Sequence, residues 1–213
     1  PDSVKDIEIL NKSLMVKNSA EKNKHGLSAT SIVDSIKNLS KNSIPPVEKW
    51  NPPFCGNLDI RIARDGTWFY LGTPIGRPEL VKLFSSILKK EGDLYFLVTP
   101  VEKVGITVED APFVAVDFNK RNQGGSDVLI FETQVGDKIV AGPLNPIWVR
   151  VNQETKEPSP YILVRRNLEA LIDRKSFYRL ADIGTHTEIE NQNWFGVWSS
   201  NKFFPLILSH ELE

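Results

Sequence analysis

Five cations in this sequence lie where they could bind an anion. They are Arg77, Lys103, Arg150, Arg165 and Arg166, each next to a predicted strand end or helix start. A positive side chain beside the free N–H groups of a helix start can hold a phosphate. The alternative is that all five are ordinary surface charges among 26 basic residues. The sequence therefore offers a candidate anion site but does not show that its members converge.

Two aromatic residues and three carboxylates could complete such a site. Trp198 and Tyr178 could stack on a nucleobase, since aromatic rings bind heterocycles through their faces. Packing in the core is their alternative role. Glu102, Glu109 and Asp110 are the carboxylates nearest the cations in sequence. They could contact a ribose, and the alternative for them is a salt bridge or a turn cap.

No motif in the sequence has catalytic or metal-binding spacing. The glycine-containing loops at 72–76 and 123–125 match neither a P-loop nor a dinucleotide fingerprint. Cys55 has no histidine near it in the sequence, as a nucleophile would need. The three histidines are scattered, at His25, His186 and His210. We therefore expect no metal and no cofactor, and an enzyme is the less favoured class.

Composition excludes further classes of protein. The 213 residues include 26 basic and 27 acidic side chains, and a net charge of -1 provides no general attraction to nucleic acid. Apolar runs reach only about five residues, far short of the roughly 20 that span a bilayer, so we expect no membrane partner. Cys55 is the single cysteine and the start lacks a signal pattern, which predicts a cytoplasmic protein.

The elements that would position these residues are strands and helices in alternation. Residues 1–26 hold few apolar side chains and are predicted to be a flexible tail. Leu58–Ile62 and Thr67–Leu71 flank Asp65-Gly66, which predicts a tight hairpin. A helix is predicted over 78–88, with proline in its first turn. An earlier helix, beginning after Ser28 or Thr30, would cover a sheet with one apolar face made of Ile32, Val33, Ile36 and Leu39.

A pattern of strand, arginine, helix and strand occurs twice. The first copy comprises Trp68–Leu71, Arg77, the helix over 78–88, and Leu94–Val98; the second comprises Tyr161–Val164, Arg165 and Arg166, a helix over 168–180, and Trp194–Trp198. Residue types agree between the copies but identities barely do, so the pattern alone leaves duplication open. Most predicted strands are joined by short turns, which only antiparallel pairs allow. The sequence therefore predicts an α+β fold of two related, mainly antiparallel lobes, residues 27–120 and 121–213.

Several motifs arrive in an order that resembles a bacterial family. The motifs are Asp65–Tyr70, Arg77–Val81, Val98–Lys103, Val108–Val114, Val164–Leu171, Phe177-Tyr178, Gly196–Ser199 and Phe203–Leu206. Together they resemble the family catalogued as domain of unknown function 1285, over roughly Pro52 to Leu208. The resemblance implies a duplicated α+β architecture whose C-terminal lobe is similar to a pleckstrin-homology barrel. It also implies a site at the lobe interface for a nucleotide-like ligand, and a role in signal transduction.

Two functional hypotheses follow. The first is a non-catalytic protein that binds an anionic, nucleotide-like molecule between the lobes. Among the cations, Arg77, Lys103 and Arg165 rank first because they match the family motifs. With Asp110, Tyr178 and Trp198 they are the expected ligand-binding residues. The second is an interaction module whose C-terminal lobe docks a signalling partner through Phe203–Leu206. A closing core strand explains the same four residues, so the exposure of Phe203 and Phe204 distinguishes the two readings.

Overall fold

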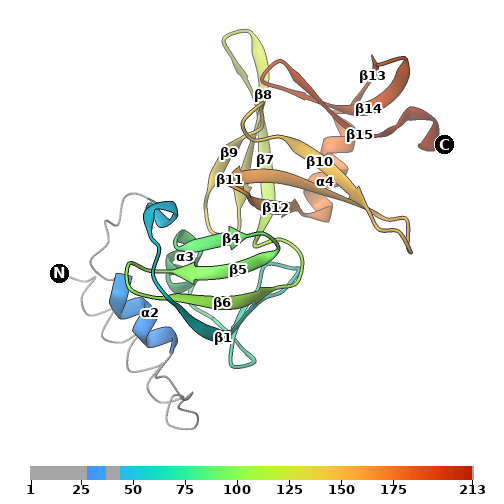
Figure 1. The fold of residues 1–213 in the computed structure, drawn as a ribbon. Helices are drawn as coiled ribbons and strands as arrows, with labels where there is room; N and C mark the ends of the chain where they lie inside the picture. Colours follow the sequence, from blue (N-terminus) through green and yellow to red (C-terminus); the bar gives the residue numbers. More distant parts are fainter. Residues whose placement is uncertain (1–27, 37–43, 213) are drawn as a thin grey trace. The chain divides into compact units, whose positions relative to one another are not determined.

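The computed structural model describes residues 28–36 and 44–212. The tail predicted over 1–26 and the predicted helix residue Leu39 lie outside the described residues. The chain divides into two compact units, and each is described by itself (Figure 1). Unit 1 comprises Pro1–Ala63 and Thr67–Glu109, and unit 2 comprises Arg64–Gly66 and Asp110–Glu213.

Unit 1 contains a six-stranded mixed sheet with the order β3-β2-β1-β6-β5-β4. The predicted hairpin is confirmed, because Ile62 pairs with Trp68 across the turn that contains Gly66. The other pairs are antiparallel, in agreement with the mainly antiparallel lobe predicted, but β1 and β6 pair in parallel at the centre. The strands are β1 (Phe54–Ile62), β2 (Trp68–Tyr70), β3 (Thr73–Pro74), β4 (Leu88–Glu91), β5 (Leu94–Val98) and β6 (Lys103–Val108).

Two α-helices bury apolar faces in unit 1. Helix α2 (Ala29–Ile36) buries Ala29, Ile32, Val33 and Ile36, as its spacing predicts. A short 3-10 turn, η1 (Val47–Lys49), precedes β1. Helix α3 (Pro78–Ser86) places Phe84 against Trp68 of β2, with ring centroids 6.3 Å apart. It ends earlier than predicted, because Leu88 already belongs to β4.

Unit 2 contains a second six-stranded sheet, with the order β10-β11-β12-β7-β8-β9. Its central pair, β7 and β12, is parallel and the other pairs are antiparallel. Position 120, where the sequence pattern divided the lobes, lies inside β7. The strands are β7 (Phe113–Gln123), β8 (Ser126–Thr133), β9 (Lys138–Val140), β10 (Ile147–Val151), β11 (Pro158–Arg165) and β12 (Leu168–Ile172).

The two sheets share one topology. Read backwards, the order in unit 2 becomes β9-β8-β7-β12-β11-β10, which corresponds strand for strand to β3-β2-β1-β6-β5-β4. In both sheets two three-stranded meanders join through a parallel pair of their first and last strands. The fold is α+β, with two related strand-rich units. The sequence pattern paired the wrong elements, however, because β11 corresponds to β5 and not to β2.

The helix predicted over 168–180 is wrong in its first part. Leu168–Ile172 forms β12, which lies between β11 and β7 and is largely buried on both faces. A strand buried on both faces lacks the alternation of apolar and polar residues, so a short apolar run resembles a helix. Helix α4 (Arg174–Asp182) begins only after Asp173, whose carboxylate accepts a hydrogen bond from Ser176 N at 2.7 Å.

The C-terminal end of unit 2 forms an antiparallel sheet of β13 (Thr185–Ile189), β14 (Gln192–Ser199) and β15 (Lys202–Leu208) (Figure 1). A last 3-10 turn, η2 (Ser209–Glu211), follows. Ser199 connects this sheet to the larger one: its hydroxyl accepts from Leu129 N and donates to Ala141 O, at 2.8 and 2.7 Å. Within residues 28–36 and 44–212, no helix combines the length and the apolar character needed to cross a membrane.

Candidate functional site

The predicted site residues fall in both units. Arg77 is the residue before α3, and its carbonyl accepts from Leu80 N and Val81 N at 3.1 and 3.2 Å. Its main chain thus starts the helix, while its side chain is half-buried. Arg77 and Lys103 belong to unit 1, and the others, Asp110, Arg165, Tyr178 and Trp198, belong to unit 2.

Lys103, at the start of β6, is paired with a carboxylate. Its Nζ lies 3.0 Å from Glu91 Oε2 and 4.9 Å from the centroid of the Phe96 ring. Lys89 Nζ contacts the same carboxylate at 3.2 Å. The hydrogen bond from Lys103 is the main reason why the pKa of Glu91 is lowered. Much of the charge of Lys103 is therefore already offset within unit 1.

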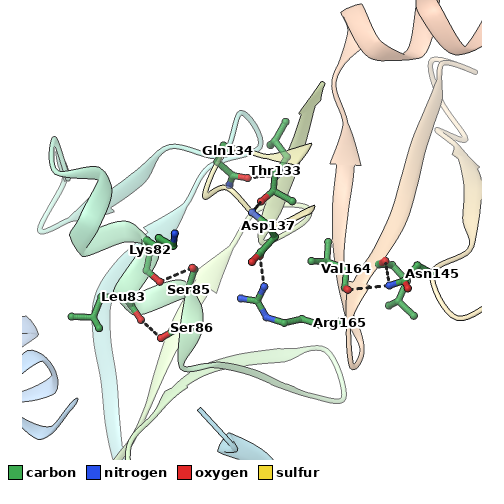
Figure 2. Close-up of polar contacts among 12 residues, drawn as sticks. Lys82, Leu83, Ser85, Ser86, Thr133, Gln134, Asp137, Asn145, Val164 and Arg165 are labelled. Carbon is green, nitrogen blue, oxygen red and sulfur yellow. Dashed lines mark hydrogen bonds and ion pairs between the residues drawn. The ribbon is translucent and has the colours of Figure 1, made fainter. Parts of the chain in front are cut away.

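Arg165 is held inside unit 2. Its guanidinium forms an ion pair with Asp137 (Figure 2). The guanidinium carbon also lies 4.7 Å from the centroid of the Phe113 ring. Only 12% of its side chain is exposed. At the neighbouring Val164, the carbonyl accepts a hydrogen bond from Asn145 Nδ2 at 3.0 Å, which connects the end of β11 to the loop between β9 and β10 (Figure 2). These contacts indicate that Arg165 has a largely structural role.

Tyr178 and Trp198 are exposed, by 57% and 46% respectively. Core packing, the alternative role considered for both, is therefore wrong. Tyr178, on α4, accepts a hydrogen bond at its hydroxyl from Arg174 Nε at 3.0 Å. Trp198, on β14, packs against Phe203 with ring centroids 5.4 Å apart. Both rings remain accessible for stacking.

The three candidate carboxylates all have protein partners. Glu109 forms an ion pair with Arg61. Glu102 accepts a hydrogen bond from Ser35 Oγ at 3.2 Å, and burial raises its pKa. Asp110 contacts Arg64 Nη1 at 3.0 Å and accepts from a tyrosine hydroxyl described below. The salt-bridge interpretation is confirmed for Glu109 and Asp110.

That tyrosine, Tyr161 on β11, is the centre of a network that sequence reasoning missed. The Tyr161 hydroxyl donates to Asp110 at 2.8 Å, and Arg64 Nη2 donates to Ser159 Oγ at 2.8 Å. Burial raises the pKa of Tyr161, and the neighbouring Asp110 carboxylate raises it further. All members of this network, which we call the Tyr161 network, belong to unit 2: Arg64, Asp110, Trp148, Arg150, Ser159, Tyr161 and Glu169.

Arg150 is one of two half-exposed cations of the Tyr161 network, and the other is Arg64. The Nη1 and Nη2 atoms of Arg150 donate to the two carboxylate oxygens of Glu169, at 2.7 and 2.5 Å. Its guanidinium carbon lies 4.2 Å from the centroid of the Tyr161 ring and 5.6 Å from that of Trp148. The hydrogen bonds with Glu169 are the main reason why the pKa of Arg150 is raised. The Arg150 side chain is 48% exposed and that of Glu169 only 8%.

The strand register brings these planar groups together. Trp148 pairs directly with Tyr161, and their rings are nearly parallel, with an angle of 19° and centroids 6.1 Å apart. Arg150 lies two residues from Trp148 on β10, and therefore on the same face of the sheet. Glu169 on β12 reaches that face from the other side of β11. We call Trp148, Arg150 and Tyr161 the planar platform.

Part of the planar platform was visible in the sequence. Arg150 was among the five candidate cations, and the spacing of Trp148 and Arg150 in a predicted strand places them on one face. Tyr161 and Glu169 come from strands whose pairing no local signal reveals. No group of three or more His, Cys, Asp or Glu residues that could hold a metal occurs in the part of the chain that the structure describes.

Phe203 and Phe204 do not form the exposed patch on which the interaction hypothesis depended. They are 9% and 2% exposed and belong to the core of unit 2. Their strand, β15, closes the C-terminal sheet. The closing-strand interpretation is therefore the correct one for these residues.

Comparison with known proteins identifies the family. Residues 45–111 match the model "Domain of unknown function (DUF1285), N-terminal domain", and residues 112–206 match "Protein of unknown function (DUF1285), C-terminal domain". No curated protein matches.

Two crystal structures of family members are similar to the chain. A DUF1285 family protein from Silicibacter pomeroyi DSS-3 is 59% identical with a TM-score of 0.76, over 85% of this chain and 97% of the other. One from Shewanella baltica OS155 is 34% identical with a TM-score of 0.46, over 58% of this chain and 90% of the other. The two family models and the Silicibacter pomeroyi structure show that the chain belongs to the DUF1285 family, with the N-terminal and C-terminal domains of that family in succession.

Proposed function

We propose that this protein is a non-catalytic binder of an anionic, nucleotide-like ligand, and that the planar platform of unit 2 is where the ligand's base stacks. The observation that carries the proposal is the half-exposed guanidinium of Arg150, whose carbon lies 4.2 Å from the centroid of the buried Tyr161 ring and 5.6 Å from that of Trp148. Nucleobases stack on aromatic rings and on guanidinium planes without needing a particular base sequence. A pre-oriented plane loses little entropy when a ligand binds.

The platform is a better candidate than the cations ranked first from the sequence. Arg165 is largely buried and paired with Asp137, and Lys103 is paired with Glu91. Arg150 is also paired, with Glu169, but bidentate pairing through Nη1 and Nη2 still leaves guanidinium N–H groups to donate to a phosphate. The exposed rings of Tyr178 and Trp198 are the second choice for a stacking partner.

The pleckstrin-homology-like fold and the signalling role stay predictions. Antiparallel meanders and one helix in unit 2 favour the comparison with a pleckstrin-homology barrel, whereas the parallel pairing of β7 with β12 does not. A role in signal transduction would follow from selective binding of a regulatory nucleotide. The cytoplasmic location predicted from the sequence fits such a ligand.

The experiment is a thermal-shift screen of the full chain against nucleotides, cyclic nucleotides and inorganic phosphate at fixed ionic strength. A ligand at about 100 times its dissociation constant stabilises the folded state by about 2.7 kcal/mol. We expect a nucleotide to raise the melting temperature and phosphate alone to have little effect. Arg150→Lys keeps a cation beside Glu169 but removes the plane, so it should abolish the shift.

Arg179→Lys is the matched control. Arg179 also forms an ion pair, with Asp117, and lies 4.5 Å from the centroid of the Phe118 ring, but it is not part of the planar platform. The nucleotide should stabilise this variant as much as the parent. If no nucleotide changes the melting temperature, or if both lysine variants respond like the parent, the proposal is wrong.

A further inference from the structure

We propose that β13 is the contact edge of a symmetric dimer, in which it pairs antiparallel with β13 of a second copy of this chain. The strand is the outer member of the sheet β13-β14-β15. Thr185, His186 and Glu188 on it are exposed. An edge strand presents N–H and C=O groups that can pair with a further strand, and natural edges are often blocked by proline, lysine or a bulge. The five residues of β13 include neither proline nor lysine, and their register with β14 is unbroken.

The turn between β13 and β14 determines which backbone groups face outwards. Ile189 pairs with Gln192, and the two turn residues, 190–191, have φ values of 50° and 62°. This is a two-residue turn of type I′, in which the flanking residues form a hydrogen-bonded pair. Hydrogen-bonded and non-hydrogen-bonded pairs alternate along the strands. His186 and Glu188 therefore direct their N–H and C=O groups to the outer edge.

If the twofold axis of the dimer passes through Thr187, the outward N–H and C=O groups of each β13 lie opposite those of the other. This axis sets His186 opposite Glu188 of the second copy, and Glu188 opposite His186, so that each pair can exchange both backbone hydrogen bonds. The paired side chains lie on one face, and an imidazole opposite a carboxylate is a favourable cross-strand pair. An axis at His186 would instead set two imidazoles opposite each other, and an axis at Glu188 would set two carboxylates opposite each other. The side chains therefore select the register centred on Thr187.

The imidazole of His186 is already oriented within its own chain. Its Nδ1 lies 2.8 Å from Ser209 Oγ, and the ring packs on Phe195 with centroids 5.2 Å apart. Because Nδ1 is used in this contact, Nε2 is the nitrogen that would meet Glu188 of the second copy. The ring is thus fixed before the edges pair, which reduces the entropy lost on dimer formation.

Disulfide cross-linking tests the register. The Thr187 residues of the two copies would form a non-hydrogen-bonded pair with Cα atoms about 4.5 Å apart, within the range that a disulfide spans. In a Cys55→Ser background, Thr187→Cys should form a covalent dimer on mild oxidation. Thr185→Cys is the matched control, since residue 185 would face Ile189 of the second copy. A monomeric Thr187→Cys variant, or equal cross-linking of the two variants, would overturn the proposal.

Charge exchange tests the side-chain pairing. In sedimentation equilibrium, His186→Glu should raise the dimer dissociation constant roughly tenfold or more, because two carboxylates then face each other twice. The double variant His186→Glu with Glu188→His should return the constant to within about threefold of the parent value. A double variant as weak as the single one would show that His186 acts only within its own chain. A parent protein that remains monomeric at every concentration would also overturn the proposal.

Discussion

The two members of the ion pair between Arg150 and Glu169 should differ in how much stability their substitution costs. Glu169 is buried, whereas Arg150 is half exposed. Removing the arginine leaves a carboxylate in the core without its counter-ion, but removing the charge of the glutamate leaves an arginine that water can still solvate. We therefore expect Arg150→Met to lower the free energy of unfolding more than Glu169→Gln does.

The magnitudes follow from burial. Breaking a fully buried ion pair costs about 3 to 5 kcal/mol, and the exposure of Arg150 reduces this to about 2 to 3 kcal/mol for Arg150→Met. Glu169→Gln keeps an acceptor for one of the two hydrogen bonds and should cost about 1 kcal/mol. Replacing both residues by methionine removes the buried, unpaired carboxylate, so the free energy of unfolding of the double variant should lie within about 1 kcal/mol of that of the parent.

Urea denaturation at constant pH, followed by circular dichroism, measures these differences. We expect Arg150→Met to lose more stability than Glu169→Gln. Equal losses, or a larger loss for Glu169→Gln, would refute the view that burial of the carboxylate determines the cost. A double variant less stable than Arg150→Met would refute it as well.

Three further predictions concern other parts of the molecule. Because burial raises the pKa of Glu102, the folded state holds this proton more tightly than the unfolded chain, and the contribution of Glu102 to stability should fall as pH rises above the ordinary pKa of a glutamate. Glu102→Gln, which still accepts from Ser35, removes that contribution, so in urea titrations at several pH values the variant should lose less stability than the parent as pH rises. Asp173→Ala removes the N-terminal cap of α4 and should lower the free energy of unfolding by about 1 kcal/mol, which a lower melting temperature would reveal, whereas Asp173→Asn should retain most of the stability. Gly184→Ala would place a Cβ 2.2 Å from Phe195 Cζ and should cost about 1 to 3 kcal/mol in thermal unfolding; a neutral result would mean that the ring moves aside freely.

Local chemistry in the sequence predicted local structure well. Asp65-Gly66 between two apolar strands predicted the hairpin of β1 and β2, because a tight turn needs residues that tolerate positive φ, and Gly66 has a φ of 84°. The spacing of Ile32, Val33 and Ile36 predicted α2, because residues three and four apart lie on one face of a helix. Both signals act over a few residues.

The sequence pattern could not predict which strands pair when they lie far apart in the chain. The parallel pairs β1–β6 and β7–β12 join segments far apart in the chain, and no turn residue marks them. The apolar run of β12 was mistaken for a helix because both of its faces are buried. In the candidate site, the hydrogen bond between Tyr161 and Asp110 joins residues 51 positions apart, so only the fold reveals the network.

Ligand binding at the planar platform can be tested directly by NMR of the tryptophan side chains. The chain has five tryptophans, and a sample labelled with 15N at the indoles gives a resonance for each, assigned by single Trp→Phe variants. On titration with the nucleotide that stabilises the protein most, we expect the Trp148 resonance to move with saturation while that of the buried Trp68 stays in place. Movement of Trp198 with an unchanged Trp148 would contradict the assignment of the platform as the binding site.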